Sequence, residues 1–224
     1  MRKNGRGGSA VSLKGRAAIV QYIEEEKIIA IIRAQSSQAL MEVVEALKRG
    51  GIHCIEVTMT TPGALEILEE VRKHMDDVLF GAGTVLDPET ARLCIASGAQ
   101  FLVTPSLNER VIEMAHRYDV PIIPGALTPT EILRAWECGA EVVKVFPASS
   151  LGPSYIRELK GPFPHIKLCP TGGVNLENVA DFLKAGASCV GVGGSLVRKD
   201  FIEGKQWEEL TDLARRFKEA VRLL

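Results

Sequence analysis

Short apolar runs with the character of β-strands recur along this chain at intervals of about 20 to 25 residues. They are rich in branched and aromatic residues and are short enough to be single strands. The runs begin near Ile28, His53, Val78, Phe101, Pro121, Val142, Lys167 and Ser188. This rhythm predicts eight strands.

Segments with helical spacing separate the apolar runs. They cover residues 37–49, 62–74, 88–96, 108–118, 128–137, 155–159 and 175–184, and a final one spans about 205–224. A further short helix is expected at Arg16–Glu26, before the first run. Four of the helical segments end in a glycine, at Gly50, Gly98, Gly139 and Gly186, as a left-handed helix cap requires. The chain therefore alternates strands with helices.

Alternation of strands and helices with short connections predicts a parallel sheet. Eight such units in about 200 residues fit a closed (β/α)₈ TIM barrel with an extra N-terminal helix. An open, doubly wound sheet is the structural alternative, but its usual nucleotide loops, GxGxxG and GxxxxGK[ST], are absent. We expect a single catalytic barrel domain over residues 16–224, preceded by a disordered basic arm over residues 1–15.

Composition narrows the class of partner. The 224 residues include 27 basic and 28 acidic side chains, so the charge balance favours neither nucleic acid nor a membrane. No apolar run approaches the ~20 residues that a membrane span needs. The five cysteines are scattered and never spaced as CxxC, which predicts reduced thiols and a cytoplasmic location. The four histidines are scattered too, and no metal-ligand spacing is visible.

Two charged residues, Lys144 and Glu56, interrupt the apolar runs. A charge in such a run must leave water, which is costly unless the group is paired or becomes neutral. Lys144 is either a structural lysine, snorkelling or ion-paired, or a desolvated amine kept as a nucleophile for carbonyl substrates. Glu56 is either its structural partner or an acid–base group.

The predicted barrel favours the catalytic interpretation of this pair. Glu56 and Lys144 fall on the second and sixth strands, and alternate strands of a barrel contribute side chains to the same interior layer. The two side chains would then project from opposite walls, whereas a simple structural ion pair would tend to join neighbouring strands. A small substrate between the amine and the carboxylate explains this arrangement better.

Polar and glycine residues also follow the strands, where barrel enzymes place their active sites. Glycine pairs follow the seventh and eighth strands, the loops that commonly bind phosphate, because glycine lets backbone N–H groups approach an anion. A single threonine or glycine loop after a strand also fits a plain turn or helix cap. The candidate substrate-binding residues are Arg33, Thr84, Thr104, Phe146, Thr171, Gly172, Gly173, Gly193, Gly194 and Ser195.

Five short segments between about residues 28 and 197 carry a resemblance to a known family. They are Ile55-Glu56-Val57-Thr58, Gly81-Ala82-Gly83-Thr84-Val85, Val143-Lys144-Val145-Phe146-Pro147-Ala148, Gly161-Pro162-Phe163 and Pro170-Thr171-Gly172-Gly173-Val174. In order and spacing they closely resemble the KDPG/KHG aldolases. That resemblance implies a (β/α)₈ barrel assembled as a homotrimer, with no metal and no other cofactor.

The resemblance also implies roles for individual residues. Lys144 matches the family's Schiff-base lysine, Glu56 its general acid/base, and Thr84 a position that contacts the carboxylate of pyruvate. One departure is Thr60, which stands where some members have an arginine that binds this carboxylate. Carboxylate binding would then fall to Arg33, Thr84 or backbone donors.

Phosphate binding by resemblance falls to Gly172, Gly173 and Ser195. Arg33 matches an arginine that part of the family carries at the end of the first strand. The second glycine loop is doubly glycine as well, at Gly193-Gly194.

The activity implied is that of a class I aldolase of the Entner–Doudoroff pathway. It cleaves 2-keto-3-deoxy-6-phosphogluconate to pyruvate and glyceraldehyde 3-phosphate, or 4-hydroxy-2-oxoglutarate to pyruvate and glyoxylate. The partner expected is thus a small 2-keto acid, phosphorylated in the first case. The alternatives are a 2-keto-3-deoxy-6-phosphogalactonate aldolase and a non-catalytic phosphosugar-binding barrel.

Overall fold

The computed structural model describes residues 13, 15–33 and 37–224, so the arm expected over residues 1–15 lies almost entirely outside the described residues. The elements in chain order are α1 (Arg16–Glu26), β1 (Ile28–Ile32), α2 (Ser37–Arg49), β2 (Cys54–Thr58), α3 (Ala64–His74), β3 (Leu79–Gly83), α4 (Pro88–Ala96), β4 (Leu102–Val103), α5 (Glu109–Arg117), β5 (Ile122–Ile123), β6 (Gly125–Ala126), α6 (Pro129–Glu137), β7 (Val143–Val145), the 3₁₀ helix η1 (Ala148–Ser150), α7 (Gly152–Lys160), β8 (Leu168–Pro170), α8 (Val179–Lys184), β9 (Val190–Val192), α9 (Lys199–Glu203) and α10 (Trp207–Val221). None of these helices is both long and apolar enough to cross a membrane.

The strands fall where the apolar runs predict them, and α1 has the bounds expected for the first helix. The predicted fifth strand is divided, because Pro124 separates β5 from β6 and a proline has no N–H to donate to a ladder. The final helix predicted over about 205–224 is confirmed as α10, but the short helix α9 before it was not predicted. The chain forms α9 first, and α10 begins at Trp207.

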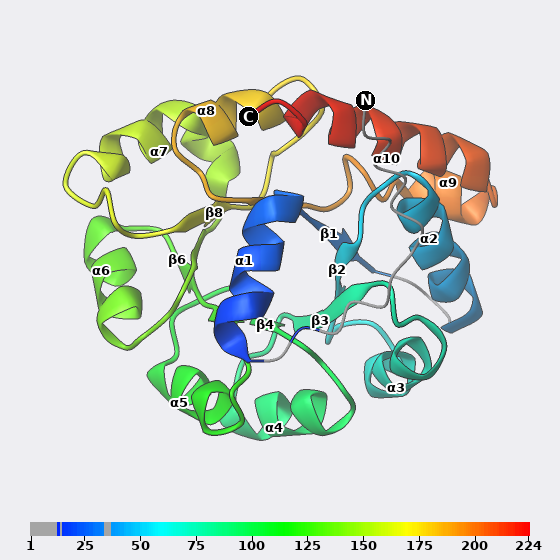
Figure 1. The fold of residues 1–224 in the computed structure, drawn as a ribbon, viewed down its shortest axis with the longest axis horizontal. Coiled ribbons are helices and arrows are strands. Elements are labelled where there is room, and N and C mark those ends of the chain that lie inside the picture. The colour runs from blue at the N-terminus through cyan, green and yellow to red at the C-terminus, as the bar shows by residue number, and fades with distance from the viewer. Residues whose placement is uncertain (1–12, 14, 34–36) are drawn as a thin grey trace, which may run out of the picture.

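Every strand pair among the described residues is parallel. A six-stranded sheet has the order β5-β4-β3-β2-β1-β9, and a three-stranded sheet has the order β6-β7-β8. The two sheets adjoin where Pro124 connects β5 to β6 and where an isolated bridge pairs Thr171 with Gly191. Helices α2 to α10 lie around the outside of the strands (Figure 1).

Alternate residues of each strand divide between two apolar clusters, because successive side chains of a strand point to opposite faces. Val143 and Val145 of β7 belong to the cluster that includes the surrounding helices, whereas Val142, directly before β7, belongs to the cluster that includes residues of α1. The second group, here called the inner cluster, consists of Ile19, Val20, Ile23, Ile29, Cys54, Leu79, Phe101, Val103, Ile123, Val142, Cys169 and Cys189. The strands therefore have an outer face toward the helices and an inner face, one end of which is filled by this cluster.

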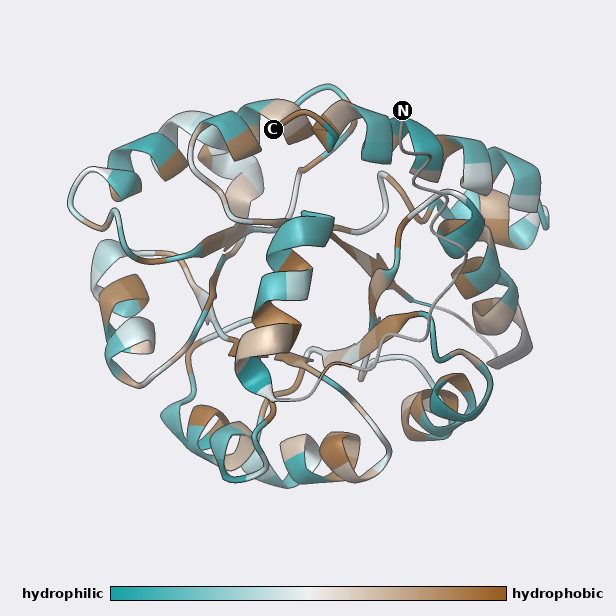
Figure 2. Cartoon of the chain, in the orientation of Figure 1, coloured by the Kyte–Doolittle hydropathy of each residue, from teal (hydrophilic) through white to brown (hydrophobic). Residues whose placement is uncertain are grey.

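Helix α1 covers that filled end. Its buried residues, Ile19, Val20 and Ile23, all belong to the inner cluster, and the helix crosses the middle of the strand assembly in Figure 1. In Figure 2 the strands are mostly brown, and the outward faces of the surrounding helices are mostly teal. Helix α1 consequently closes one end of the inner face, and a reaction on that face is confined to the other end.

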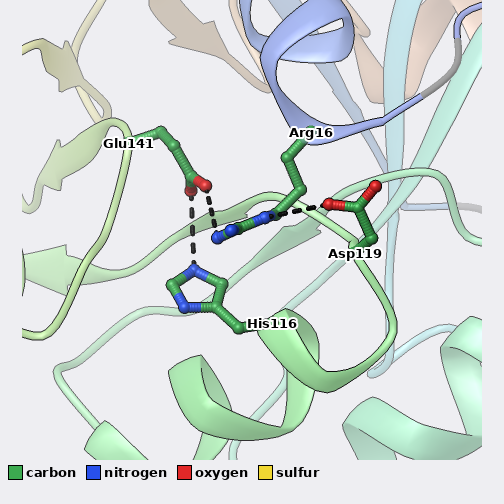
Figure 3. A network of polar contacts seen from close by, with 4 residues as sticks. All are labelled: Arg16, His116, Asp119 and Glu141. Carbon is green, nitrogen blue, oxygen red and sulfur yellow. Dashed lines mark hydrogen bonds and ion pairs between the residues drawn. The ribbon is translucent and has the colours of Figure 1, made fainter.

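A polar network joins α1 to the strand assembly (Figure 3). The Arg16 guanidinium donates to Asp119 Oδ1 at 3.2 Å and to Glu141 Oε1 at 2.7 Å. His116 Nε2 lies 3.7 Å from Glu141 Oε2, and both atoms are buried without a hydrogen-bond partner. Burial, and next the charge of Arg16, lower the pKa of His116, which favours the neutral ring. Arg16 thus ties the start of α1 to two loops of the strand assembly.

Candidate active site

Lys144 occupies the centre of β7, with its side chain on the inner face. It follows Val142 of the inner cluster by two residues, so the two side chains share a face. Lys144 is only 6% exposed, and its Nζ lies 4.9 Å from the ring centroid of Phe146. Among the described residues its side-chain amine forms no hydrogen bond and no ion pair within 4.0 Å. The amine is therefore neither at the surface nor held in a structural ion pair.

Glu56 lies in the middle of β2 on the inner face, two residues after Cys54 of the inner cluster. It is 2% exposed, and its carboxyl group lies against the backbone of Gly83 on the neighbouring strand β3. Burial raises the pKa of this carboxyl group, while the positive charges of Lys144 and Arg33 oppose the rise. A carboxyl group whose pKa is raised toward neutrality is suited to exchange protons with a substrate.

The two groups interact through space without touching. Lys144 is the first charge that counteracts the raised pKa of Glu56, yet no ion pair within 4.0 Å joins them in the described part of the chain. Had the pair been purely structural, direct contact would be expected, because buried charges of opposite sign gain most when paired and hydrogen-bonded. The two groups are therefore close enough to interact electrostatically and yet are not in direct contact.

A cavity of about 290 Å³ opens at the same end of the inner face. Its lining residues come from the ends of β1, β7, β8 and β9 and from the two glycine loops. They are Ile31, Arg33, Phe146, Thr171, Gly172, Gly173, Val174, Asn175, Gly191, Gly193, Gly194 and Ser195. Most of the substrate-binding residues predicted from the sequence are therefore brought together here.

The cavity presents donors suited to an anion. Arg33 is the one cationic side chain among the lining residues. In the described hydrogen bonds, no acceptor is found for the backbone N–H groups of Gly172, Gly173, Gly194 and Ser195. Exposed N–H groups in a glycine loop form an anion-binding concavity. The hydroxyl group of Ser195 donates to the carbonyl oxygen of Val174, so its backbone N–H is the readier donor.

Two predicted residues lie elsewhere. Thr104 is buried, and its hydroxyl group donates to the Ser106 carbonyl at 2.6 Å while it accepts from the Gly125 N–H at 3.1 Å. The first hydrogen bond closes the turn after β4 and the second joins it to β6, so Thr104 has a turn role. Thr84 follows β3 with a φ of 60°, a conformation that costs strain in a branched residue. It lines a second cavity, not the one beside Arg33.

The second cavity, about 490 Å³, lies beside the ends of β2 and β3. Thr60 also lines it, and the Thr60 hydroxyl lies 2.9 Å from that of Thr58. The Thr61 hydroxyl lies 3.4 Å from Thr58 on the other side. At the position where the resemblance leads one to look for an arginine, this chain therefore has a cluster of neutral hydroxyl groups.

Several lining residues were not predicted. Asn175 resembles a helix cap in sequence, and its Oδ1 does accept from the N–H groups of Glu177 and Asn178, at 3.1 and 3.0 Å. Its contribution to the cavity wall has no sequence signal. Gly191 could have been found as the glycine that ends the eighth apolar run. A Cβ there would lie 2.4 Å from Thr171 Oγ1, so glycine makes room for that side chain.

The strands are parallel, the inner face carries an unpaired lysine and a carboxyl group, and an anion cavity adjoins them. These features define a class of enzyme-like domains that can form covalent adducts with carbonyl compounds. The sequence model of the family described as "Aldolase: KDPG and KHG aldolase" matches residues 19–213. The chain belongs to this family.

Individual relatives agree with the family match. The chain is 38% identical over 198 residues to a 2-dehydro-3-deoxy-phosphogluconate aldolase of Treponema pallidum, covering 88% of this chain and 94% of the relative. It is 32% identical to a 2-dehydro-3-deoxy-6-phosphogalactonate aldolase of Escherichia coli K12, covering 90% of this chain and all of that one.

A solved structure of KDPG aldolase from Legionella pneumophila, with pyruvate captured at low pH as a covalent carbinolamine intermediate, superposes with a TM-score of 0.83. It is 31% identical to this chain and covers 88% of it, and 96% of the Legionella chain is matched. The similarity thus spans nearly the full length of both proteins.

Proposed function

We propose that this protein is a class I aldolase that reversibly cleaves 2-keto-3-deoxy-6-phosphogluconate to pyruvate and glyceraldehyde 3-phosphate. The observation that carries the proposal is Lys144, a buried inner-face amine without an ion pair, set opposite the Glu56 carboxyl group. Family membership and relatives named for this activity support the same reaction. The Legionella structure, in which pyruvate is bound covalently, supports a carbonyl adduct as the first step.

In this mechanism the Lys144 amine attacks the C2 ketone, and loss of water from the carbinolamine gives a protonated imine. Glu56, through a water, exchanges the protons of that dehydration and accepts the proton of the C4 hydroxyl group. As the C3–C4 bond breaks, its electrons move into the imine and leave an enamine of pyruvate. Glyceraldehyde 3-phosphate departs, and protonation at C3 followed by hydrolysis releases pyruvate and restores the amine.

Substrate recognition is assigned to the two ends of the site. The phosphate group fits the 290 Å³ cavity, where Arg33 and unpaired backbone N–H groups meet. The carboxylate of the keto acid is assigned to Thr84, with Thr60 as a neutral donor in place of an arginine. Phe146 and Thr171 line the space between Lys144 and the glycine loops. We also propose 4-hydroxy-2-oxoglutarate as a second, non-phosphorylated substrate.

The galactonate isomer is the alternative substrate, because one relative is named for it. A kinetic comparison of the two phosphorylated isomers and 4-hydroxy-2-oxoglutarate decides among them. The non-catalytic phosphosugar-binding barrel differs from all of these, because it would form no covalent adduct with a keto acid.

The decisive experiment is incubation with pyruvate and borohydride, followed by peptide mapping. An aldolase acquires a reduced pyruvyl adduct on Lys144, and Lys144→Met, a side chain of similar length without an amine, acquires none. Lys160 is the matched control lysine, because it is partly buried but donates to the carbonyl groups of Pro164 and Ile166. Absence of an adduct on the folded wild-type protein would overturn the proposed mechanism.

We further propose that residues 16–224 form one closed (β/α)₈ barrel, with α1 as an extra helix closing its N-terminal end. The two junctions between the sheets, at Pro124 and at the Thr171–Gly191 bridge, support closure. The free thiols of all five cysteines support a reducing, cytoplasmic location.

A homotrimer is proposed from the family resemblance. Support comes from an apolar face beside the 490 Å³ cavity, where Leu86 and Leu93 are 56% and 55% exposed. Exposed leucines around a hollow are typical of a surface that another protein chain covers.

A further inference from the structure

Gly83 ends β3 directly beside Glu56 and carries no side chain on the inner face. It pairs with Thr58 in the β2–β3 ladder, and Thr58 lies two residues after Glu56 on the same face of β2. A Cβ built at Gly83 would lie 2.5 Å from Glu56 Oε1, 2.8 Å from Cδ and 3.4 Å from Oε2. Its three nearest neighbours are thus all atoms of the carboxyl group, and two of them are closer than van der Waals contact permits.

The backbone of Gly83 does not itself require glycine. Its φ lies outside the left-handed region that favours this residue, unlike that of Gly172 or Gly173. Crowding elsewhere along the strand has a different source: a Cβ at Gly81 would lie 2.6 Å from the Phe101 ring, a rigid group of the inner cluster. The carboxyl group of Glu56, which supplies all three nearest atoms, therefore accounts for a residue without a side chain at Gly83.

That carboxyl group has no other anchor. In the described residues the Glu56 carboxyl group makes no hydrogen bond and no ion pair within 4.0 Å. Its position is set by the surfaces around it, of which the bare backbone of Gly83 is one. Displacing a reacting group by about 1 Å can reduce a rate roughly 100-fold.

We propose that Gly83 is a positioning residue. Because it has no side chain, it leaves the space that the Glu56 carboxyl group occupies at working distance from Lys144. This inference rests on the proposed aldolase function and extends it to a residue that touches no substrate. Because the carboxyl group is the far end of a flexible side chain, a methyl group at position 83 moves it at little cost to the fold.

The test is a double-mutant cycle of Gly83→Ala and Glu56→Ala, read as kcat and KM for 2-keto-3-deoxy-6-phosphogluconate and as thermal unfolding midpoint. Gly83→Ala is expected to lower kcat about 10- to 100-fold in the presence of Glu56, with a smaller change in KM. In the Glu56→Ala background the same substitution should change kcat less than about threefold, because the displaced group is gone. Its effect on the unfolding midpoint should likewise disappear.

Equal losses in both backgrounds, in kcat or in unfolding midpoint, would overturn the inference, since Gly83 would then serve the backbone alone. If Gly83→Ala unfolds, rescue of folding by Glu56→Ala supports the contact, and unfolding in both backgrounds contradicts it. Gly81→Ala is the control on the same strand and face, and its cost should persist without Glu56. An inactive wild-type protein would contradict the proposed function, whereas the unfolding cycle would still test the Gly83–Glu56 contact.

Discussion

Glu56 and Lys144 both lie on the inner face, each two residues after a member of the inner cluster, and no ion pair within 4.0 Å joins them. Burial raises the pKa of Glu56, and the charge of Lys144 only partly opposes that rise. A direct contact would have favoured two fixed charges. The gap instead leaves a carboxyl group able to gain and lose a proton beside an amine that is open to a substrate.

Glu56→Gln is expected to remove most activity and yet stabilise the fold as pH rises. The folded-state pKa of Glu56 lies above the unfolded value, so the wild-type protein loses stability as pH rises from the unfolded pKa through the folded one. Glutamine does not titrate and avoids this loss, which amounts to about 1.4 kcal/mol for each unit between the two pKa values. Urea unfolding of both proteins across acidic to alkaline pH measures the difference.

Glu219→Gln, on the exposed side of α10, is the control for that measurement. It should show no comparable growth of stability with pH. A stability difference between Glu56→Gln and wild type that stays constant over the whole range would contradict a buried carboxyl group with a raised pKa. The activity of Glu56→Gln should fall about 10²- to 10⁴-fold, which is the usual contribution of general acid–base catalysis.

Arg33→Met should weaken the binding of phosphorylated substrates more than the binding of 4-hydroxy-2-oxoglutarate. Methionine keeps an unbranched stem but removes the one cation of the glycine-loop cavity. A charged hydrogen bond contributes about 1.5–3 kcal/mol, so KM for the phosphorylated substrate should rise about tenfold or more. Lys199→Met removes a cation on the exposed α9 and should change neither KM. Equal losses for both substrates would place Arg33 at the carboxylate instead of the phosphate.

Arg16→Ala should destabilise the protein by about 1–3 kcal/mol, because it leaves the half-buried Glu141 carboxylate without its 2.7 Å donor. Chemical unfolding monitored by circular dichroism measures the loss. Lys199→Ala, which breaks an exposed pair with Glu203, is the control and should have little effect. A loss no larger than the control's would mean that the ion pairs of Arg16 contribute little to holding α1 in place.

Leu93→Glu should reduce the assembly state, because it places a charge in the apolar face proposed to be buried between copies. Sedimentation of wild-type and variant proteins at equal concentration measures the change. Leu223→Glu, near the C-terminus and 93% exposed, is the matched control. An intact trimer in Leu93→Glu would exclude this face as the interface, and a monomeric wild type would contradict the trimer itself.

Local pattern was sufficient for much of the architecture. The spacing of apolar runs predicted the strands, and the helix over Arg16–Glu26 was expected with the bounds of α1. Pro124 was visible in the sequence, but whether it ends a strand or merely divides one depends on which neighbours supply the ladder on either side. The separate helix α9 was missed for the same reason, since a helix this short is stabilised by packing more than by its own sequence.

The sequence by itself determined the chemical types at the site: a lysine and a glutamate in apolar strands, an arginine after the first strand, and two glycine loops. Only the tertiary structure decided which of these groups meet. It assembled Arg33 with the glycine loops, assigned Thr104 to a turn, separated Thr84 into another cavity and seated Glu56 against Gly83. Contacts between residues far apart in the chain depend on how strands pair and which way their side chains face, and no local pattern encodes the distances that result.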